Sequence, residues 1–420
     1  MDSEYLYTLY KKHPIICTDT RHIIKGSIFF ALKGKNFNGN LFAKNAIELG
    51  CSFAVIDEKK FAVNKSYILV EDVLNSLQKL AELHRKKLSI PVIGITGSNG
   101  KTTSKELIAS VLNRKYRISY TKGNLNNHIG VPLSVLQISK DDEIAIIEMG
   151  ANHIGEIASL CNIAKPNFGV ITNIGKAHLE GFGGISGVII AKSELYKSIE
   201  TKKEGLLFVN KDDSTLMNLS DKIKRVTYGK NGDVAGKVVQ EIPFLSLEVN
   251  GERINSNLIG SYQFYNILLA FTVGVFFKVP REKIISSIEK YIPKNNRSQI
   301  INTEYNKIIL DAYNANPTSM EETLIYFCKY KERKICILGD MLELGFDSKK
   351  EHKRIMNLTK QLGLKSLFVG KEFSKASNKD GVYKNNDCLK ENLKKIDIKN
   401  TLILIKGSRG LMLEELIEFL

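Results

Sequence analysis

The chain has 420 residues, 43% of them hydrophobic and 25% charged, a composition that excludes a wholly disordered or fibrous protein. Its length predicts about two to four domains. The formal net charge of +16 would suit a nucleic-acid binder. However, the lysines are spread along the chain without a basic block, so we expect no nucleic acid as a partner.

No segment is expected to cross a membrane. The longest nearly apolar stretch, residues 267–277, is about half the length that a membrane span requires, and the first residues show no signal-peptide pattern. The six cysteines form no Cys-x-x-Cys pair, which argues against a disulfide framework and a cysteine zinc site. Reduced thiols are typical of the cytoplasm, where we expect the protein to act.

The first part of the chain alternates short strand patterns with helical patterns, and we expect residues 1–88 to form a small N-terminal α/β domain. The expected strands are residues 27–32, 53–56 and 67–70. The expected helices are residues 41–49 and 73–87.

A central domain, residues 89–293, is expected to begin with the apolar run at 90–96. Further buried-strand patterns lie at residues 143–148, 168–172 and 205–209, with helical patterns between them. Two helices are expected near its end, at residues 258–278 and 281–291. Strands that alternate with helices predict a mostly parallel sheet.

The Pro- and Asn-containing segment 292–296 is expected to be a linker. Beyond it, residues 294–420 are expected to form a C-terminal Rossmann-like domain with a doubly wound sheet. The expected strands are residues 307–310, 334–338, 366–369 and 401–405. The expected helices are residues 319–329, 349–362, 387–396 and 411–419.

A glycine-rich turn between the first central strand and the next helix is typical of a phosphate-binding loop. Backbone N–H groups in such a turn, together with the helix N-terminus, attract phosphate oxygens. Lys101 would reach the β- and γ-phosphates, and the Thr102 hydroxyl would bind Mg²⁺. The strict spacing of the motif requires a glycine at position 95, whereas here the glycine is Gly94. The expected nucleotide-binding residues of this loop are Gly97, Ser98, Asn99, Gly100, Lys101, Thr102 and Thr103.

Two further polar groups follow neighbouring strands of the central sheet. Glu148 ends the second expected strand, and His178 lies with Glu180 in a glycine-rich loop after the third. Ligands of open α/β sheets bind outside the carboxyl ends of the strands, so Glu148 is expected to hold Mg²⁺ opposite Thr102. The loop that carries His178 is expected to form a second cation site or to grip the substrate. Lys192, taken alone, is typical of a solvent-exposed helix lysine.

Together these segments resemble the Mur ligase family, and the resemblance covers nearly the whole chain. The segments at 18–21 and 26–34 are similar to the family's uridine-nucleotide-binding domain. The resemblance implies that three domains meet around one ATP and close about a hinge, for which residues 292–297 are the candidate. The other similar segments are TGSNGKTT at 96–103, EMGANHIGEI at 148–157, TNIGKAHLEGFG at 172–183, AKSEL at 191–195, DAYNANPTSM at 311–320, LGDMLELG at 338–345 and KGSRGLMLEE at 406–415.

The resemblance implies a two-step reaction in which ATP phosphorylates the terminal carboxylate of the substrate and an amine then attacks the acyl phosphate. It implies two Mg²⁺ sites and a carbamylated Lys192, which would turn a cation into an anionic metal ligand. The implied catalytic residues are Lys101, Glu148, His178 and Lys192. The implied metal ligands are Thr102, Glu148, His178 and Lys192.

The resemblance also implies nucleotide contacts outside the phosphate loop. Asn266 corresponds to an asparagine that contacts adenine, and Arg297 to an arginine that meets the nucleotide phosphates on domain closure. Asp311 would bond the ribose, and Asn314 belongs to a run at the face of the C-terminal domain toward ATP.

The YNANP run at 313–317 and the LGDMLELG segment indicate one activity within the family. That activity joins D-alanyl-D-alanine to UDP-N-acetylmuramoyl-tripeptide in cytoplasmic peptidoglycan synthesis, and a monomer is expected. One alternative is another ligase of the family, either a diamino-acid-adding enzyme or a folylpolyglutamate synthase. The YNANP run argues against the first, and the uridine-type domain against the second. The other alternative is a P-loop ATPase that acts on a partner.

Overall fold

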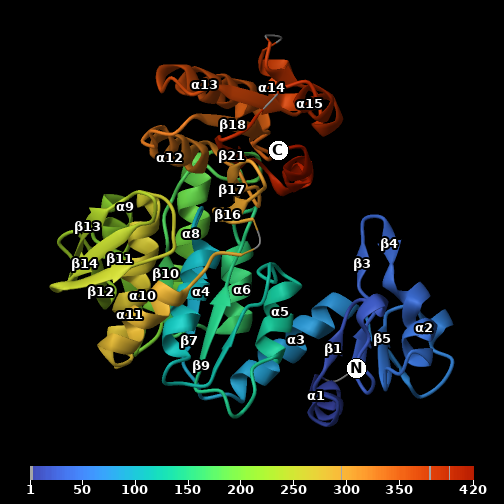
Figure 1. The fold of residues 1–420 in the computed structure, drawn as a ribbon. Helices are drawn as coiled ribbons and strands as arrows, with labels where there is room; N and C mark the ends of the chain where they lie inside the picture. The colour runs from blue at the N-terminus through green and yellow to red at the C-terminus, as the bar shows by residue number, and fades with distance from the viewer. Residues whose placement is uncertain (1–2, 295, 378–379, 397) are drawn as a thin grey trace.

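The computed structural model describes residues 3–294, 296–377, 380–396 and 398–420. It confirms the three-domain α/β fold with mostly parallel sheets that the sequence predicts (Figure 1). The expected hinge at 292–297 includes residue 295, which lies outside the described residues. Among the described helices, none combines the length and the hydropathy that a membrane span needs.

The N-terminal domain is a small parallel sheet with helices packed around it. A hairpin of β3 (Lys33–Gly34) and β4 (Phe37–Asn38) projects from the domain (Figure 1). The first strand has only two residues, too few to show a pattern in the sequence. The sheet order is β1-β2-β5-β6, with bounds Ile16–Cys17, Ile28–Phe30, Phe53–Ile56 and Tyr67–Leu69. The helices are α1 (Ser3–Lys12) and α2 (Ala43–Glu48).

Helix α3 (Val73–Lys86) joins the N-terminal sheet to the central domain. It begins after Asp72, whose carboxylate accepts a hydrogen bond from the Asn75 N–H at 2.6 Å and so satisfies a free donor of the first turn. The helix packs against α1 on one side and against α5 (Gly130–Leu136) and α6 (Glu156–Ala164) on the other. One helix therefore carries contacts to both domains.

The central sheet has nine strands in the order β15-β14-β13-β12-β11-β10-β7-β9-β8. The strands from β8 to β13 run parallel, whereas β13, β14 and β15 form an antiparallel ribbon that the sequence patterns did not predict. The ribbon is partly exposed, so it lacks the continuous apolar run of a strand buried on both faces. The bounds are β7 Val92–Thr96, β8 Ile118–Tyr120, β9 Ile144–Glu148, β10 Phe168–Ile171, β11 Leu206–Asn210, β12 Arg225–Gly229, β13 Val234–Gln240, β14 Ser246–Val249 and β15 Glu252–Asn255.

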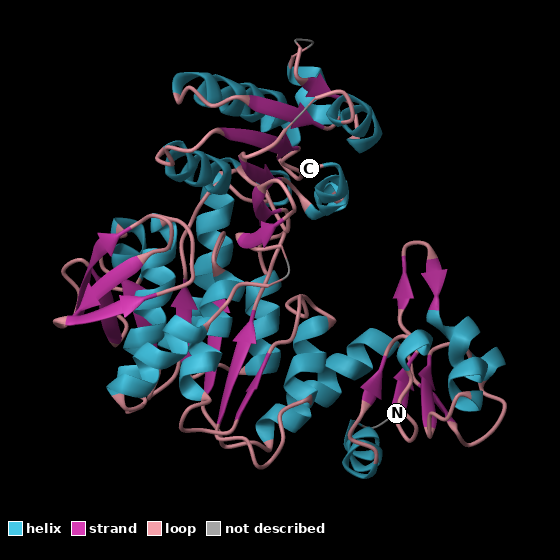
Figure 2. Cartoon of the chain, viewed as in Figure 1, coloured by secondary structure: helices cyan, strands magenta, loops and turns pink. Residues whose placement is uncertain are grey.

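Helices cover both faces of this sheet (Figure 2). On one face α4 (Lys101–Leu112) packs against α10 (Phe264–Phe276) and α11 (Arg281–Lys290). On the other face α8 (Ile185–Glu200) packs beside α6. Neighbouring residues of β7 therefore enter different cores, which explains why its five residues are all buried. Two shorter helices, α7 (Leu179–Phe182) and α9 (Ser214–Leu219), lie in the loops.

The helix expected at 258–278 is wrong at its start, because α10 begins only at Phe264. Gly260 has a φ of 96°, a backbone conformation that helical residues do not adopt. Leu258 and Ile259 are buried but lie before the helix, so their apolar character reflects core packing and not helix periodicity.

The C-terminal domain is a six-stranded sheet in the order β16-β17-β21-β18-β19-β20, in which only β16 and β17 pair antiparallel. The α-helix expected at 411–419 is replaced by a 3-10 helix at Leu413–Phe419. The strands are β16 Gln299–Asn302, β17 Lys307–Asp311, β18 Lys334–Gly339, β19 Ser366–Val369, β20 Val382–Tyr383 and β21 Leu402–Lys406. The helices are α12 Pro317–Cys328, α13 Ser348–Gln361, α14 Lys371–Ala376 and α15 Asn386–Leu393.

Candidate active site

A cavity of about 820 Å³ lies where the central domain meets the C-terminal domain. Its walls come from strand ends of both sheets, in agreement with the rule that open α/β sheets bind ligands beyond the carboxyl ends of their strands. Of the residues that the sequence singles out, only Gly97 and Lys192 do not line it. Those that line it are Ser98, Asn99, Gly100, Lys101, Thr102, Thr103, Glu148, His178, Asn266, Arg297, Asp311 and Asn314.

The glycine-rich turn after β7 leads directly into α4. Gly100 is the residue before the helix and has a φ of 78°, which is accessible to glycine at little cost. A Cβ atom at this position would lie 2.7 Å from Oδ1 of Asn266, so the close approach also requires glycine. The first N–H groups of α4 are thereby left at the cavity, where they can bind an anion.

Lys101 is folded back over the turn, where its Nζ donates to the carbonyl oxygens of Gly97 (2.6 Å) and Ser98 (3.3 Å). Desolvation lowers the pKa of Lys101, while Glu148 opposes that shift. The ammonium group therefore lies within the loop that is expected to hold phosphate.

Residues after β10 hold the turn in place. The Thr172 hydroxyl donates to the Asn99 carbonyl at 2.6 Å, and Asn173 Oδ1 accepts from the Asn99 N–H at 3.0 Å. Ser98 is tied to the same segment, because its hydroxyl donates to the Gly175 carbonyl at 3.0 Å. The turn is thus fixed by side chains from the adjacent strand end, and little reorganisation is needed to bind a ligand.

Glu148, at the end of β9, is only 1% exposed. Its Oε1 accepts hydrogen bonds from the Thr102 hydroxyl (3.1 Å) and from Asn126 Nδ2 (2.8 Å). Its Oε2 has no hydrogen-bond partner among the described residues and lies 3.6 Å from Nζ of the fully buried Lys105. The structure therefore brings Thr102 and Glu148 together, as the sequence predicts, and leaves one buried carboxylate oxygen without a hydrogen bond.

Lys192 lies in α8 and is 2% exposed, so the interpretation as a solvent-exposed helix lysine is wrong. Helix periodicity alone does not reveal this burial, because α7 and Phe182 cover the side chain from outside the helix. Burial, together with the nearby charge of Lys101, lowers the pKa of Lys192 to about 7. The amine is therefore partly neutral near physiological pH.

His178 precedes α7 and has a φ of 52°, which is uncommon for a residue with a side chain. Its ring lines the cavity, and its Nδ1 contacts the carboxylate of Glu343 in the C-terminal domain. The interaction with His178 lowers the pKa of Glu343.

The C-terminal domain contributes an aromatic and charged wall. The Arg297 guanidinium lies 3.6 Å from the centre of the Tyr313 ring, which holds it in a cation–π contact. Asp311 at the end of β17 pairs with the buried Lys406 at the end of β21, and its other oxygen accepts from the Ser298 N–H at 3.1 Å. Arg297 supplies positive charge to this wall, and the Asp311 carboxylate supplies an acceptor for hydroxyl groups.

Asn316, the N-cap of α12, bridges the two domains, because its Nδ2 donates to Asn99 Oδ1 at 2.7 Å. On the central side, Asn266 is held by the Ser104 hydroxyl (2.9 Å) and donates to Gln263 at 2.7 Å. Both buried amides are therefore fixed at the edge of the phosphate loop.

Sequence reasoning missed several residues of the cavity. Asn210 ends β11, Asp212 and Asp213 follow it, and all three line the cavity. The strand-end rule that identified Glu148 would also have found them. Asn126 and Lys105 had no such signal, since their importance depends on contact with Glu148.

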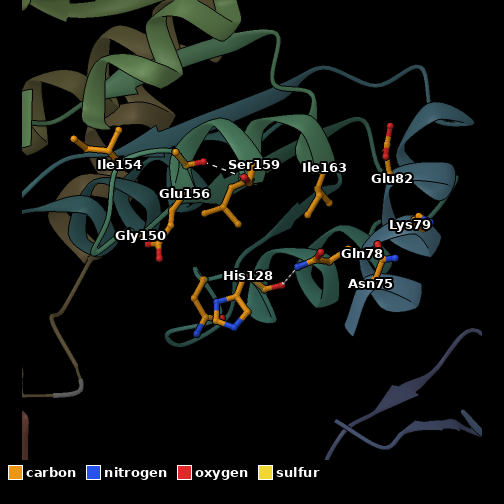
Figure 3. Close-up of a pocket in the computed structure, with 13 residues that line it drawn as sticks. Asn75, Gln78, Lys79, Glu82, His128, Gly150, Ile154, Glu156, Ser159 and Ile163 are labelled. Carbon is orange, nitrogen blue, oxygen red and sulfur yellow. Dashed lines mark hydrogen bonds between the residues drawn. The ribbon is translucent and has the colours of Figure 1, made fainter. Parts of the chain in front are cut away.

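A second cavity, of about 660 Å³, adjoins the first and shares Asn127, His128, Gly150 and Glu156 with it. Its walls are α3, α6 and the loop before α5, as Figure 3 shows. Gln78 Nε2 of α3 donates to the His128 carbonyl at 3.0 Å and so connects helix and loop. This groove lies between the N-terminal domain and the phosphate loop.

Comparison with known families gives two matches. Residues 95–274 match the Mur ligase middle domain, and residues 296–409 match the glutamate ligase domain of the Mur ligases. UDP-N-acetylmuramoyl-tripeptide--D-alanyl-D-alanine ligase from Bacillus subtilis is 34% identical, covering 96% of this chain and 92% of the relative. The Escherichia coli enzyme of the same name is 30% identical, covering 96% of this chain and 93% of the relative.

Solved structures show the same similarity. MurF from Acinetobacter baumannii superposes with a TM-score of 0.86 at 29% identity, covering 96% of this chain and 92% of that one. MurF ligase from Thermotoga maritima, solved in complex with ADP, gives a TM-score of 0.82 at 26% identity, with 96% of both chains covered.

Proposed function

The chain belongs to the Mur ligase family, and we propose that it uses ATP to join D-alanyl-D-alanine to UDP-N-acetylmuramoyl-tripeptide in peptidoglycan synthesis. The observation that carries this proposal is the single cavity in which the phosphate loop, Glu148 and the C-terminal strand ends meet. Similarity over nearly the full chain to ligases of this activity supports the choice within the family.

The first step activates the terminal carboxylate of the tripeptide. A carboxylate is a poor electrophile because it is anionic and has no good leaving group. Attack of its oxygen on the γ-phosphorus of ATP forms an acyl phosphate and releases ADP. Lys101 and the N–H groups at the start of α4 would neutralise the negative charge on the transferred group.

The second step forms the amide. The amine of D-alanyl-D-alanine attacks the acyl carbon, a C–N bond forms, the C–O bond to phosphate breaks, and the amine loses a proton. Water would compete with the amine for the acyl phosphate. The C-terminal domain lies over the cavity and is joined to the loop after β7 by the Asn316–Asn99 hydrogen bond, an arrangement that would exclude water.

We propose that Thr102 and Glu148 hold a Mg²⁺ ion. The buried oxygen of Glu148 that has no hydrogen bond, with the Thr102 hydroxyl on its other oxygen, is an oxygen donor set of the kind that Mg²⁺ prefers. In the part of the chain that the structure describes, no group of three or more His, Cys, Asp or Glu side chains forms a metal site. This fits Mg²⁺, which commonly binds through one or two carboxylates and the substrate phosphates. When bound, the ion would supply positive charge to the phosphoryl oxygens.

We propose a second Mg²⁺ site with His178 and a carbamylated Lys192 as ligands. Carbamylation requires a neutral amine, which attacks carbon dioxide, forms an N–C bond and loses a proton. A pKa of about 7 makes the neutral form available, and Lys101 lies near enough to contribute to that shift. The product is an anion in a buried position beside the phosphate loop.

The substrate must reach from the N-terminal domain to the phosphate loop, and the groove between α3 and α6 lies on that path. A related enzyme from A. baumannii is named for a substrate with an alanyl, D-glutamyl, diaminopimelate peptide. Such a peptide has a free glutamyl carboxylate besides the activated one. Lys79 of α3 and His128 line the groove, and Lys79 offers positive charge to that carboxylate (Figure 3).

We place the reaction in the cytoplasm and expect a monomer to carry it out. All six cysteines are free thiols, which supports a reducing compartment. The candidate site is built from the central and C-terminal domains of one chain, which supports function without a second subunit.

The test is phosphate release from ATP with Mg²⁺, measured with and without UDP-N-acetylmuramoyl-tripeptide and D-alanyl-D-alanine. Release that requires both, with a product whose mass increases by the dipeptide, is the expected result. Release that is indifferent to both would contradict the ligase assignment and favour an ATPase that acts on a partner.

A further inference from the structure

We propose that Glu343 is a positioning residue, which orients His178 for metal ligation only when the C-terminal domain is docked on the central domain. The Glu343 carboxylate contacts Nδ1 of His178 across the domain boundary. This inference rests on the proposed function, in which His178 binds the second Mg²⁺.

Both partners of this contact have left-handed backbones. The φ angle is 52° at His178 and 62° at Glu343, although neither residue is glycine. Residues with a Cβ atom rarely adopt this conformation, and it persists where the surrounding structure holds it. Two such residues in contact across a domain boundary indicate that the surrounding structure holds both backbones in the conformation that forms this contact.

The loop that carries Glu343 is anchored within the C-terminal domain. Each of the three residues before it, 340 to 342, takes part in a hydrogen bond there. The LGDMLELG segment at 338–345 and the serine of KGSRG at 406–410 lie outside the phosphate loop, and these hydrogen bonds give them a structural role as the anchor of the loop that carries Glu343. The bonds run from the N–H groups of Glu372 and Phe373 to Asp340 (both 2.9 Å), from the Met341 N–H to His352 Nε2 (3.0 Å) and from the Leu342 N–H to Ser408 Oγ (3.1 Å).

After this anchor the chain turns toward the central domain. Gly345 approaches Glu180, and the Glu180 N–H donates to the Glu343 carbonyl at 3.4 Å. The Glu343 side chain is 53% exposed and the His178 side chain 24% exposed, so the contact lies at the rim of the cavity. The anchored loop therefore presents a half-exposed carboxylate to the histidine, whose Nδ1 atom is itself buried.

The chemistry of the contact identifies its role. A histidine that binds a metal through one ring nitrogen commonly donates its other N–H to a carboxylate, which fixes the ring orientation and the tautomer. Nδ1 lies against the Glu343 carboxylate but makes no hydrogen bond among the described residues. In this proposal the carboxylate holds a proton on Nδ1, which leaves the lone pair of Nε2 for a metal. The simpler alternative is an ordinary interdomain ion pair, such as the one between Lys176 and Glu351 at 2.8 Å.

The experiment counts Mn²⁺ ions bound to the full chain in the presence of a non-hydrolysable ATP analogue, by electron paramagnetic resonance of the free ion. Wild type, Glu343→Ala, Glu343→Gln and Lys176→Ala are compared. Lys176→Ala is the matched control, because it removes the neighbouring interdomain pair without touching His178. We expect two ions in wild type and Lys176→Ala. We expect the second ion to bind at least tenfold more weakly in Glu343→Ala and to be partly restored in Glu343→Gln, whose carbonyl still accepts from Nδ1.

The first Mn²⁺ serves as an internal check on folding, since its ligands do not contact Glu343. The proposal would be overturned if Glu343→Ala bound both ions with wild-type affinity. It would also be overturned if Lys176→Ala weakened the second ion as much as Glu343→Ala does, or if the wild type bound only one ion. A wild type that binds two ions but forms no amide would contradict the proposed function alone.

Discussion

Lys192 and Lys101 illustrate how burial changes the chemistry of a lysine. Lys101 belongs to the phosphate loop and lies close enough to Lys192 to lower its pKa, and desolvation lowers the pKa of each lysine. Lys101 has carbonyl partners and a nearby carboxylate that favour its charged form, as phosphate binding requires. Lys192 is 2% exposed, and its nearest ring is Phe182. The same residue type is therefore suited to two different roles.

Carbamylation of Lys192 is expected to increase with pH through the neutral range. Because the pKa is about 7, the amine is mostly protonated below this pH and cannot attack carbon dioxide. At a fixed concentration of dissolved carbon dioxide, the neutral fraction rises from about a tenth at pH 6 to about nine-tenths at pH 8. Carbon-13 NMR with labelled carbon dioxide measures the carbamate directly. Lys192→Ala should lack the signal and the exposed Lys197→Ala should keep it; a signal that falls with rising pH would contradict the assignment.

Lys101→Ala is expected to lower kcat by a factor on the order of 10² to 10³, because the proposed mechanism uses its charge to stabilise the transferred phosphoryl group. The measurement is steady-state phosphate release with both substrates present. Lys115→Ala is the control, since this exposed lysine just beyond the end of α4 bonds only to carbonyl oxygens of the chain near residue 277. Normal turnover in Lys101→Ala would show that residues 96–103 do not bind the phosphates.

Helix α4 depends on the geometry of its first turn. The strand before it is buried on both faces, and the turn between them has Gly97 and Gly100 at positive φ. Side chains after β10 hold the turn, so strand end, turn and helix form one rigid unit. This rigidity keeps the N-terminal N–H groups of α4 at the cavity.

Gly100→Ala is expected to destabilise this unit by about 2–3 kcal/mol, from left-handed strain and a Cβ atom 2.7 Å from Asn266 Oδ1. Gly123→Ala is the matched control, because Gly123 also has a positive φ but no heavy atom lies within 4 Å of its Cβ position. Left-handed strain alone should lower the stability of Gly123→Ala by about 1–2 kcal/mol. Native-state hydrogen exchange of the α4 amides measures the difference, and equal protection in both variants would refute the proposed clash.

The whole molecule is a row of three domains with a groove at each junction. The groove between α3 and α6 leads from the N-terminal domain, and the larger cavity lies beneath the C-terminal domain. The two share lining residues, so they adjoin one another. In the proposed function, a long substrate held at one end would present its other end to the phosphate loop beneath the C-terminal domain.

Lys79→Ala tests this path. We expect the KM for UDP-N-acetylmuramoyl-tripeptide to rise about fivefold, as the loss of an exposed charge contact of about 1 kcal/mol implies, with the KM for ATP unchanged. Lys86→Ala, on the same helix but outside the groove, is the control. A substrate whose glutamyl carboxylate is amidated should bind the wild type and Lys79→Ala equally. If Lys79→Ala leaves every KM unchanged, the peptide does not engage this lysine.

Local patterns in the sequence determined much of the fold and part of the site. Strands such as β7 and β9 are buried on both faces, so they read as apolar runs, and the order of strands and helices predicted parallel sheets. The phosphate loop is a contiguous segment with a required backbone geometry, so it too is visible in the sequence. Glu148 followed from its place at a strand end.

Only the tertiary structure decided which distant segments meet. The ribbon of β13 to β15 is half-exposed and has no strong pattern, so it was found only in the structure. The burial of Lys192 depends on α7, which covers α8 from outside. The contact of His178 with Glu343 joins residues of two domains, and the pair of Asp311 with Lys406 joins two strand ends. Such contacts depend on how separate elements pack together, and no local pattern in the sequence specifies that packing.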